Sequence, residues 1–336
     1  MIPLDLTKLP DFLKAQRWFA GKAWPIKSVS VVDHVIMDLG TCTFTLAIIE
    51  VVYELGNPER YQLQARQTPE GLVSALEDDE CVRAVFNLAR EGRQVASGSG
   101  RVVGEWIAST DSGVALPEPL SVRRLNVEQS NTSLVLGERV IVKIIRKLEA
   151  GVNPEYEVGR FLATKTSFRA TPQLVGALNL EGPAGATLAL AHRFVPDAVD
   201  GWKYTLERLR QEKALSNGFL TDMRELGARL GELHKAFASA GPDDLAFSPE
   251  PLLQEDLQRW SASIVGELGV TLADAGRLHA DLEHKRDGLI AYAKRLAQVA
   301  PSGQKIRIHG DLHLGQVLRS QNEWLFFDFE GEPSRS

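Results

Sequence analysis

The chain has 336 residues, of which 44% are hydrophobic and 24% are charged, so it is long enough for two or three domains with sizeable cores. Its 38 basic and 44 acidic residues give a net charge of −6, and this balance does not indicate a nucleic-acid binder or a protein that docks on membranes. No apolar run is long enough to span a bilayer, and we expect no signal peptide because residues 1–20 contain no apolar h-region. The two cysteines, Cys42 and Cys81, predict neither a disulfide framework nor structural zinc, so we expect a cytoplasmic protein.

Residues 1–110 form one predicted module, which begins with a short amphipathic helix. The spacing of apolar residues predicts a second helix at 73–90. This module contains no metal-binding or nucleophile motif. Glycine and prolines at 111–120 predict a linker after this module. Alternating apolar residues predict strands at 29–37, 43–52, 60–67, 93–95 and 101–106.

Beyond the linker, the pattern is rich in strands up to residue 195 and rich in helices from residue 196. A helix begins at Asn153-Pro154-Glu155, because asparagine is a favoured N-cap and proline fits the first helical turn. Two hairpins are predicted in the strand-rich part, at 133–145 and 173–194. The main later helices are predicted at 220–238, 251–268 and 272–299.

The most informative stretch runs from His309 to Gln316 and continues into an apolar run that ends at Asp328. Two short strands with a turn at 320–323 would return Asp328 to the loop that holds Asp311 and Gln316. Phosphoryl transfer needs such a set, in which one carboxylate takes a proton from the acceptor hydroxyl while other oxygens hold Mg²⁺ against the ATP phosphates. The alternative is that the histidines are ordinary loop residues and that Asp328 only caps a strand.

Lys143 lies in an apolar strand, where an ammonium group is costly unless it reaches solvent or an anion. The helix that follows carries Glu155 and Glu157. A strand lysine that pairs with a glutamate of the next helix, close to the ATP phosphates, is typical of protein-kinase-like sites. The alternative is a solvent-exposed lysine on an edge strand.

Two further segments complete the predicted nucleotide site. The stretch Gln129-Ser130-Asn131-Thr132-Ser133 precedes Lys143, and its small polar side chains and backbone N–H groups can hold phosphate oxygens, with Ser130, Asn131 and Thr132 as the expected ligands. A solvated turn is the alternative for this stretch. Phe194 and Val195 follow a strand and precede a proline, so their backbone groups would meet the adenine in a kinase-like fold.

Taken together, the motifs resemble those of the bacterial maltokinases, which are relatives of the aminoglycoside phosphotransferases. The resemblance implies ATP-dependent phosphorylation of maltose to maltose 1-phosphate for α-glucan and glycogen synthesis. It also implies an N-terminal cap subdomain and an association with trehalose synthase. The stretches that carry the resemblance are 16–22, 128–133, 151–154, 157–162, 309–317 and 328–333.

Carried over by position, the resemblance implies a role for each site residue. Asp311 is expected to be the catalytic base, and Gln316 and Asp328 are expected to bind Mg²⁺. Lys143 is expected to bind the ATP phosphates, paired with Glu157. Gln316 replaces the asparagine that is usual in related kinases, but both side chains offer an amide oxygen to a metal.

The predicted fold is α+β and protein-kinase-like, with a cap at 1–110, a strand-rich N-lobe at 120–195 and a helical C-lobe at 196–336. Family members continue beyond the motif at 328–333, so we expect the C-lobe to be truncated here. Two alternative functions stay open. The chain could phosphorylate another hydroxylated substrate, such as glucosamine or an aminoglycoside, or it could be a catalytically silent fragment that acts only as a binding module.

Overall fold

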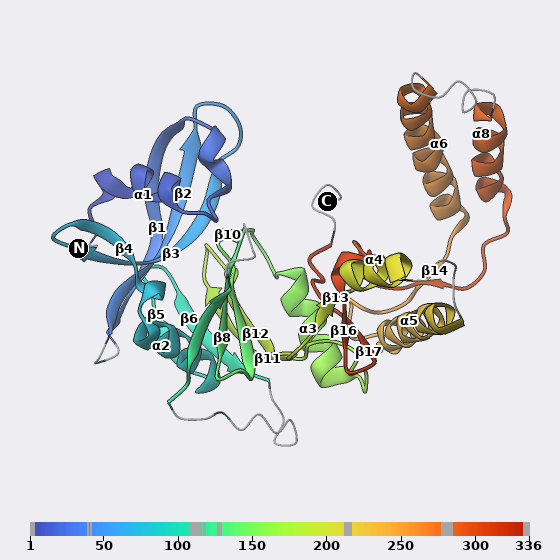
Figure 1. Ribbon diagram of the computed structural model, residues 1–336. Helices are drawn as coiled ribbons and strands as arrows, with labels where there is room; N and C mark the ends of the chain where they lie inside the picture. The colour runs from blue at the N-terminus through green and yellow to red at the C-terminus, as the bar shows by residue number, and fades with distance from the viewer. Residues whose placement is uncertain are drawn as a thin grey trace. The chain divides into compact units, whose positions relative to one another are not determined.

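The computed structural model describes residues 4–38, 40, 42–107, 116, 119–125, 130–211, 217–276 and 285–331. The chain divides into two compact units. The first consists of Met1–Leu233 and His309–Ser336, and the second of His234–Ile308. Both units mix helices with strands, and Figure 1 shows the elements of each.

The first sheet of unit 1 has the order β1-β2-β3-β10, with β4 added beside β3. Its central strand β2 is buried on both faces, because Leu46 and Ile48 enter one hydrophobic cluster while Ala47 and Ile49 enter another. Helix α1 (Leu9–Ala15) contributes to the second cluster, and two 3₁₀ turns flank it, η1 (Leu6–Lys8) and η2 (Ala20–Ala23). The strands are β1 (Ile26–Asp38), β2 (Thr43–Tyr53), β3 (Glu59–Thr68), β4 (Gly71–Ser74) and β10 (Lys147–Leu148).

The second sheet is antiparallel, with seven strands in the order β5-β6-β11-β12-β9-β8-β7. Helix α2 (Asp79–Arg90) packs closely on it, since a Cβ on Gly104 of β6 would lie only 1.9 Å from the Leu88 carbonyl oxygen. Helix α3 (Pro154–Lys165) begins at Asn153, whose side chain accepts from the Tyr156 N–H as predicted. The strands are β5 (Gln94–Ala96), β6 (Arg101–Trp106), β7 (Val122–Leu125), β8 (Thr132–Leu136), β9 (Val140–Ile144), β11 (Leu174–Glu181) and β12 (Ala186–Arg193).

The two sheets do not divide at the predicted linker, most of which lies outside the described residues. Strands β5 and β6 belong to the predicted first module, yet β6 pairs with β11 in the second sheet. Strand β10 lies in the predicted N-lobe, yet it pairs with β3 of the first sheet. Periodicity along the chain identifies a strand but not its partner, so sequence patterns could not reveal this exchange.

Two local predictions in the first module need correction. The predicted helix at 73–90 begins instead with the end of β4 and the 3₁₀ turn η3 (Ala75–Glu77), and Asp78 then caps α2. Cys42 and Cys81 are joined by a disulfide, although no disulfide was expected. The bond forms because β2 and α2 bring two cysteines 39 positions apart to a Cα–Cα distance of 5.5 Å.

The C-terminal part of unit 1 contains the predicted hairpin, formed by β16 (Val317–Ser320) and β17 (Glu323–Phe326). Gln321 and Asn322 make its two-residue turn with φ values of 46° and 67°, as a type I′ turn requires. Strand β13 (Val199–Asp200) pairs with β16. The elements around the hairpin are α4 (Gly201–Gln211), α5 (Asn217–Ala238, which continues into unit 2) and the 3₁₀ turn η6 (Leu314–Gln316).

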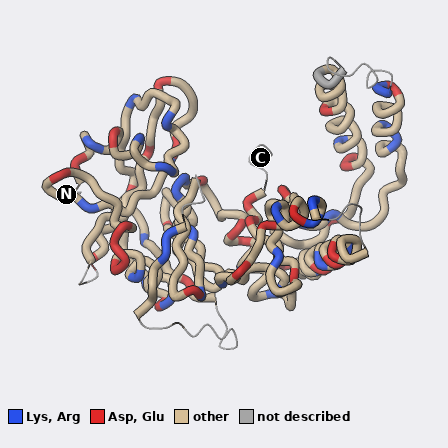
Figure 2. The backbone as a smooth tube through the Cα atoms, viewed as in Figure 1, with Lys and Arg blue, Asp and Glu red and all other residues tan. Residues whose placement is uncertain are grey.

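The described part of unit 2 contains the end of α5, two further α-helices and a small strand pair. The predicted helix at 251–268 is α6 (Gln254–Gly276), and part of the segment predicted at 272–299 lies outside the described residues. The remaining elements are α8 (Arg286–Lys294), η5 (Arg295–Gln298), β14 (Glu250–Pro251) and β15 (Gln304–Lys305). None of the helices described here combines the length and apolarity needed to cross a membrane. Residues of both charge signs are interspersed along the chain in Figure 2.

Candidate active site

A cavity of about 660 Å³ lies within unit 1. Its lining includes residues of β8, β9, β12 and α3, together with Gly315, Gln316, Leu318 and residues 327–330. A volume of this size is typical of small-molecule sites. The lining includes the predicted residues Lys143, Gln316 and Asp328, so the fold brings together parts of the chain that are far apart in sequence.

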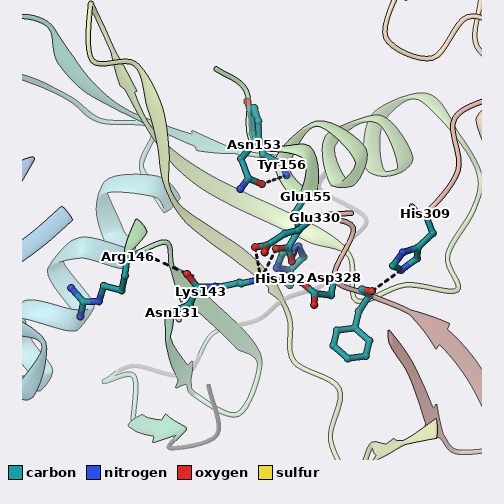
Figure 3. Close-up of polar contacts among 11 residues, drawn as sticks. Asn131, Lys143, Arg146, Asn153, Glu155, Tyr156, His192, His309, Asp328 and Glu330 are labelled. Carbon is teal, nitrogen blue, oxygen red and sulfur yellow. Dashed lines mark hydrogen bonds and ion pairs between the residues drawn. The ribbon is translucent and has the colours of Figure 1, made fainter. Parts of the chain in front are cut away.

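Lys143 is the centre of the charged groups in this cavity. Its Nζ lies 2.8 Å from Glu155 Oε2, 2.8 Å from Glu330 Oε1 and 3.2 Å from Asp328 Oδ1. Figure 3 shows the lysine directed from its strand toward these carboxylates. Burial alone would lower the pKa of Lys143, but the three carboxylates together raise it well above its ordinary value. The lysine is therefore held as a cation at this position.

The predicted partner of Lys143 was wrong, because Glu155 and not Glu157 makes the ion pair. Each residue of an α-helix advances by about 100°, so two glutamates two positions apart project from nearly opposite faces. The cap at Asn153 fixes where the helix begins and directs Glu155, which is 6% exposed, toward the strand. The sequence placed both acids on the right helix but did not identify the face that meets β9.

His192 lies next to the charged cluster around Lys143. Its Nε2 lies 3.8 Å from Glu155 Oε1, beyond hydrogen-bond distance. Burial, reinforced by the neighbouring Lys143 ammonium, lowers the pKa of His192 to about 3. The imidazole is therefore uncharged at neutral pH. Sequence reasoning missed this residue, which precedes the predicted adenine-contacting segment by two positions.

Asp328 lies beside Gln316, as the predicted hairpin requires. The Phe327 N–H donates to the Gln316 carbonyl oxygen at 3.2 Å, and both Gln316 and Asp328 line the cavity. Asp328 has φ of 64°, in the left-handed region that residues other than glycine rarely adopt. Such strain persists where surrounding structure enforces it and often marks functional positions. Here it turns the aspartate out of β17 and toward Lys143.

His309, at the start of the loop at 309–316, contacts the residues on either side of Asp328. Its Nε2 donates to the Phe327 carbonyl oxygen at 2.9 Å, and its ring packs against Phe329 at a centroid distance of 4.7 Å. Burial lowers the pKa of His309, so the imidazole stays neutral and keeps this hydrogen bond. His309 therefore ties the loop at 309–316 to the residues around Asp328.

Asp311 lies on the loop after His309, but it is not among the residues that line the cavity. Its side chain is 35% exposed, and its Oδ2 lies 4.0 Å from His313 Nε2. His313 Nδ1 accepts from the Gly315 N–H, which fixes the ring within the loop. This loop contacts the segment after Asp328, since a Cβ on Gly310 would lie 3.1 Å from the Gly331 Cα. The role of Asp311 as a base stays a prediction.

The predicted phosphate-binding turn is only partly directed into the cavity. Ser130 and Asn131 line it, but the Thr132 hydroxyl accepts from Arg146 Nε at 2.9 Å. Ser133 is the lining residue instead, because successive residues of β8 point to opposite faces. The expectation for Thr132 is therefore corrected, whereas Ser133, at the end of the same predicted stretch, lines the cavity.

Phe194 and Val195 both line the cavity, as expected for residues that would meet a base. The Phe194 N–H is already used, because it donates to the Arg139 carbonyl oxygen at 2.8 Å. Within the described part of the chain, the Val195 N–H has no hydrogen-bond partner. Val195 therefore offers the free backbone donor of this segment.

Two curated relatives resemble the chain at the level of sequence. The glucosamine kinase of Streptacidiphilus jiangxiensis is 30% identical over 226 residues, which cover 63% of this chain and 48% of that protein. The glucosamine kinase of Mycolicibacterium smegmatis is 28% identical over 221 residues, which cover 63% of this chain and 52% of that protein. The chain thus spans about half the length of the curated relatives it matches.

Solved structures show the same fold. A glucosamine kinase in crystal form A superimposes with a TM-score of 0.67 at 22% identity, covering 93% of this chain and 67% of that one. A glucosamine kinase in complex with glucosamine, ADP and inorganic phosphate gives a TM-score of 0.68 at 22% identity, covering 97% and 73%. The predicted kinase-like fold is confirmed.

Family models match two parts of the chain. Residues 12–82 match the maltokinase N-terminal cap domain, which confirms that a cap is present. Residues 121–331, more than half of the chain, match the phosphotransferase enzyme family. This match includes Lys143, Glu155, Gln316 and Asp328. The chain therefore belongs to the phosphotransferase enzyme family.

Proposed function

We propose that this protein transfers a phosphoryl group from ATP to a hydroxyl of a sugar. The observation that carries the proposal is the ion pair between Lys143 and Asp328, which joins two motifs 185 positions apart in one cavity. A lysine held by a helix glutamate, beside an aspartate that follows a hairpin, is the arrangement that kinases use around ATP phosphates. The family match over the same residues supports it.

Six of the residues that line the cavity bind or position the nucleotide in this proposal. Lys143 binds the phosphates, and Glu155 holds its ammonium in position. Val195 offers its N–H to the adenine, and Phe194 packs beside the ring. Asn131 and Ser130 border the phosphate end of the cavity.

Gln316 and Asp328 would hold Mg²⁺. Their amide and carboxylate oxygens are the hard donors that this ion prefers, and the adjacent Glu330 and Glu155 add further carboxylates within the same cluster. When bound, the ion neutralises charge on the ATP phosphates. The chain's own contribution is to keep Asp328 turned toward the cavity through its left-handed backbone and through the hydrogen bond from Phe327 to Gln316.

Asp311 is the proposed general base. A carboxylate on this loop can accept the proton of the acceptor hydroxyl as its oxygen attacks the γ-phosphorus. The bond that breaks joins the γ-phosphorus to the bridging oxygen, and ADP leaves. The hydrogen bond of His309 to Phe327 keeps the loop of Asp311 against the segment of Asp328.

Two acceptors are supported by different observations. Glucosamine is favoured because two curated relatives, each matching 63% of this chain, are named for it. Maltose, with maltose 1-phosphate as product, is favoured by the N-terminal cap, whose family model is named for maltokinase, and by the sequence motifs. A role in glycogen synthesis and an association with trehalose synthase would follow from the second acceptor. Use of ATP supports a cytoplasmic location, although a disulfide is uncommon there.

A substrate panel tests the proposal. The protein is incubated with Mg·ATP and either glucosamine, maltose, glucose or an aminoglycoside, and both ADP and the phosphorylated sugar are quantified. We expect sugar-dependent ADP release with glucosamine or maltose, and the preferred acceptor identifies the activity. ADP release that no sugar stimulates would contradict a sugar kinase, and a preference for the aminoglycoside would assign another acceptor class.

A further inference from the structure

We propose that Glu105 of β6 is a positioning residue for phosphoryl transfer, which holds helix α3 in the rotation that brings Glu155 to Lys143. The inference rests on the proposed function and adds a residue outside the cavity wall, since Glu105 is not among the residues that line the cavity. Glu105 lies between the two family matches, of which one ends at residue 82 and the other begins at residue 121.

The first observation is that two side chains of α3 meet the Glu105 carboxylate. The Tyr156 hydroxyl donates to Glu105 Oε2, and Arg160 Nε donates to Glu105 Oε1 at 3.0 Å. Each carboxylate oxygen therefore accepts from a different side chain of the helix. Tyr156 and Arg160 are four positions apart, so they project from the same face of α3. Glu105 thus holds that face at two points about one helical turn apart.

The contact with Tyr156 is partly shielded from water. The Tyr156 ring packs against the hydrophobic cluster that contains Val142 and Leu178. Burial and the hydrogen bond to Glu105 raise the pKa of Tyr156 to about 12, so the hydroxyl keeps its proton and donates at neutral pH. Hydrogen bonds to a charged acceptor are the strong ones, and this bond is therefore suited to fixing the helix.

The second observation is that α3 is held on two different faces. Successive residues of an α-helix are about 100° apart, so Glu155 and Tyr156 leave neighbouring faces. Glu155 meets Lys143 of β9, whereas Tyr156 meets Glu105 of β6. Two such contacts oppose rotation about the helix axis, which one contact alone would not prevent. The Asn153 cap sets where the helix begins, and the Glu105 contact sets how it is rotated.

The third observation is that β6 is a fixed base for the contact. Strand β6 is hydrogen bonded to β5 on one side and to β11 on the other. The residues that flank Glu105 face α2, because Gly104 lies against the Leu88 carbonyl and the Trp106 ring meets Phe86 edge to face. Side chains alternate along a strand, so Glu105 is directed to the opposite face, where it meets α3.

The alternative is that apolar packing alone positions α3. Gly159 allows a close approach to β11, since a Cβ at this position would lie 3.0 Å from Leu174 Cβ. In that case the Glu105 contact would be a surface ion pair of little effect, as many such pairs are. The ion pair between Arg101 and Glu181 supplies a matched control, because its two residues lie on β6 and β11 and neither belongs to α3.

The test compares wild type, Glu105→Ala, Tyr156→Phe and Glu181→Ala by calorimetric titration with Mg·ADP and with adenosine, and by kinetics with varied ATP. We expect Glu105→Ala to weaken Mg·ADP binding and to raise KM for ATP about tenfold, with adenosine affinity unchanged, because a displaced Lys143 affects only the phosphates. Glu181→Ala should match wild type in every measurement.

Tyr156→Phe keeps the aromatic ring and removes only the hydroxyl. It should weaken Mg·ADP binding about threefold, because Arg160 still holds the carboxylate. This variant also replaces Glu105→Ala if the alanine variant does not fold.

A double-mutant comparison separates positioning through Glu155 from a direct effect. If Glu105 acts by placing Glu155, adding Glu105→Ala to Glu155→Gln should change Mg·ADP affinity less than twofold, because the contact that it supports is already lost. A tenfold loss in both backgrounds would show that Glu105 acts independently of Glu155 and would overturn the proposal.

The remaining outcomes distinguish this inference from the proposed function. Wild-type Mg·ADP affinity in both Glu105→Ala and Tyr156→Phe would reject the positioning role and leave the proposed function intact. Equal losses for adenosine and Mg·ADP would show a general structural effect and also count against the inference. The expected Mg·ADP pattern without phosphorylation of any sugar would support the positioning role and reject the sugar kinase. Wild-type protein that binds no Mg·ADP would reject both.

Discussion

Lys143 of β9 and Glu155 of α3 form a partly buried ion pair, with 2.8 Å between Nζ and Oε2. The pair fixes the first turn of the helix against the strand that lines the cavity. Replacing Glu155 with Gln removes the carboxylate that holds the ammonium in position. We expect kcat/KM for ATP to fall by roughly 10²-fold, since misplacing a phosphate-binding group by about 1 Å has an effect of this size.

Glu157→Gln is the matched control, because it removes a carboxylate from the same helix without changing the Lys143 pair. Its kcat/KM should stay within about threefold of wild type, as expected for a change on the opposite helix face. Steady-state kinetics with varied ATP separates the two variants. A large loss in Glu157→Gln with near-normal activity in Glu155→Gln would restore the original sequence prediction.

Asp328→Asn tests the proposed metal ligand without disturbing the backbone. Asparagine adopts the left-handed conformation readily, so the variant should keep φ near 64° and fold normally. We expect Mg·ADP affinity to fall about tenfold or more while metal-free ADP affinity changes little, because a neutral amide is a weaker ligand for Mg²⁺ than a carboxylate. Titrations with and without Mg²⁺ measure this difference, and equal changes in both would exclude Asp328 as a ligand.

The sequence predicted those parts of the site that local rules determine. The hairpin at 317–326 returned Asp328 to Gln316 because turn residues and apolar alternation identify such a hairpin. The start of α3 followed from Asn153 and Pro154. Local patterns could not select Glu155 over Glu157, because that choice depends on how the helix rotates against β9. Tertiary packing likewise determines which strands pair in each sheet, and it brings Cys42 next to Cys81.

His192 should make stability depend on pH below neutrality. Burial lowers its folded-state pKa to about 3, whereas the unfolded-state value is about 6.5, so the unfolded chain binds the extra proton between these limits. The contribution of the neutral imidazole to the free energy of unfolding is therefore complete above about pH 6.5. This contribution is lost as the pH falls toward 3, by roughly 1.4 kcal/mol per pH unit. Between pH 7 and pH 5 this amounts to about 2 kcal/mol.

His192→Gln, which cannot gain a proton, should remove this part of the pH dependence. Urea unfolding at pH 7 and pH 5 gives the free energy of unfolding for wild type and variant. The decrease between the two pH values should be smaller in the variant by about 2 kcal/mol. An identical decrease in both proteins would mean that His192 is not held neutral in the folded state.

The disulfide between Cys42 and Cys81 should stabilise the cap region. It closes a loop with a sequence separation of 39, for which chain-entropy arguments give about 4 kcal/mol. Thiol titration of the unfolded, unreduced protein should detect no free thiol, and reductant should lower Tm. The double variant Cys42→Ser/Cys81→Ser should have a lower Tm that no longer responds to reductant. Two free thiols per chain in unreduced protein would show that the bond does not form.

The central claim, phosphoryl transfer to a sugar with Asp311 as base, is tested most directly by one comparison. Wild type and Asp311→Asn are assayed for phosphosugar formation from Mg·ATP with the preferred acceptor, and Mg·ADP affinity is measured on the same samples. We predict that kcat falls by roughly 10²–10⁴-fold in the variant while Mg·ADP affinity is unchanged, because only the proton acceptor is lost. Near-normal turnover in Asp311→Asn, or no phosphosugar from wild type with any acceptor, would contradict the account.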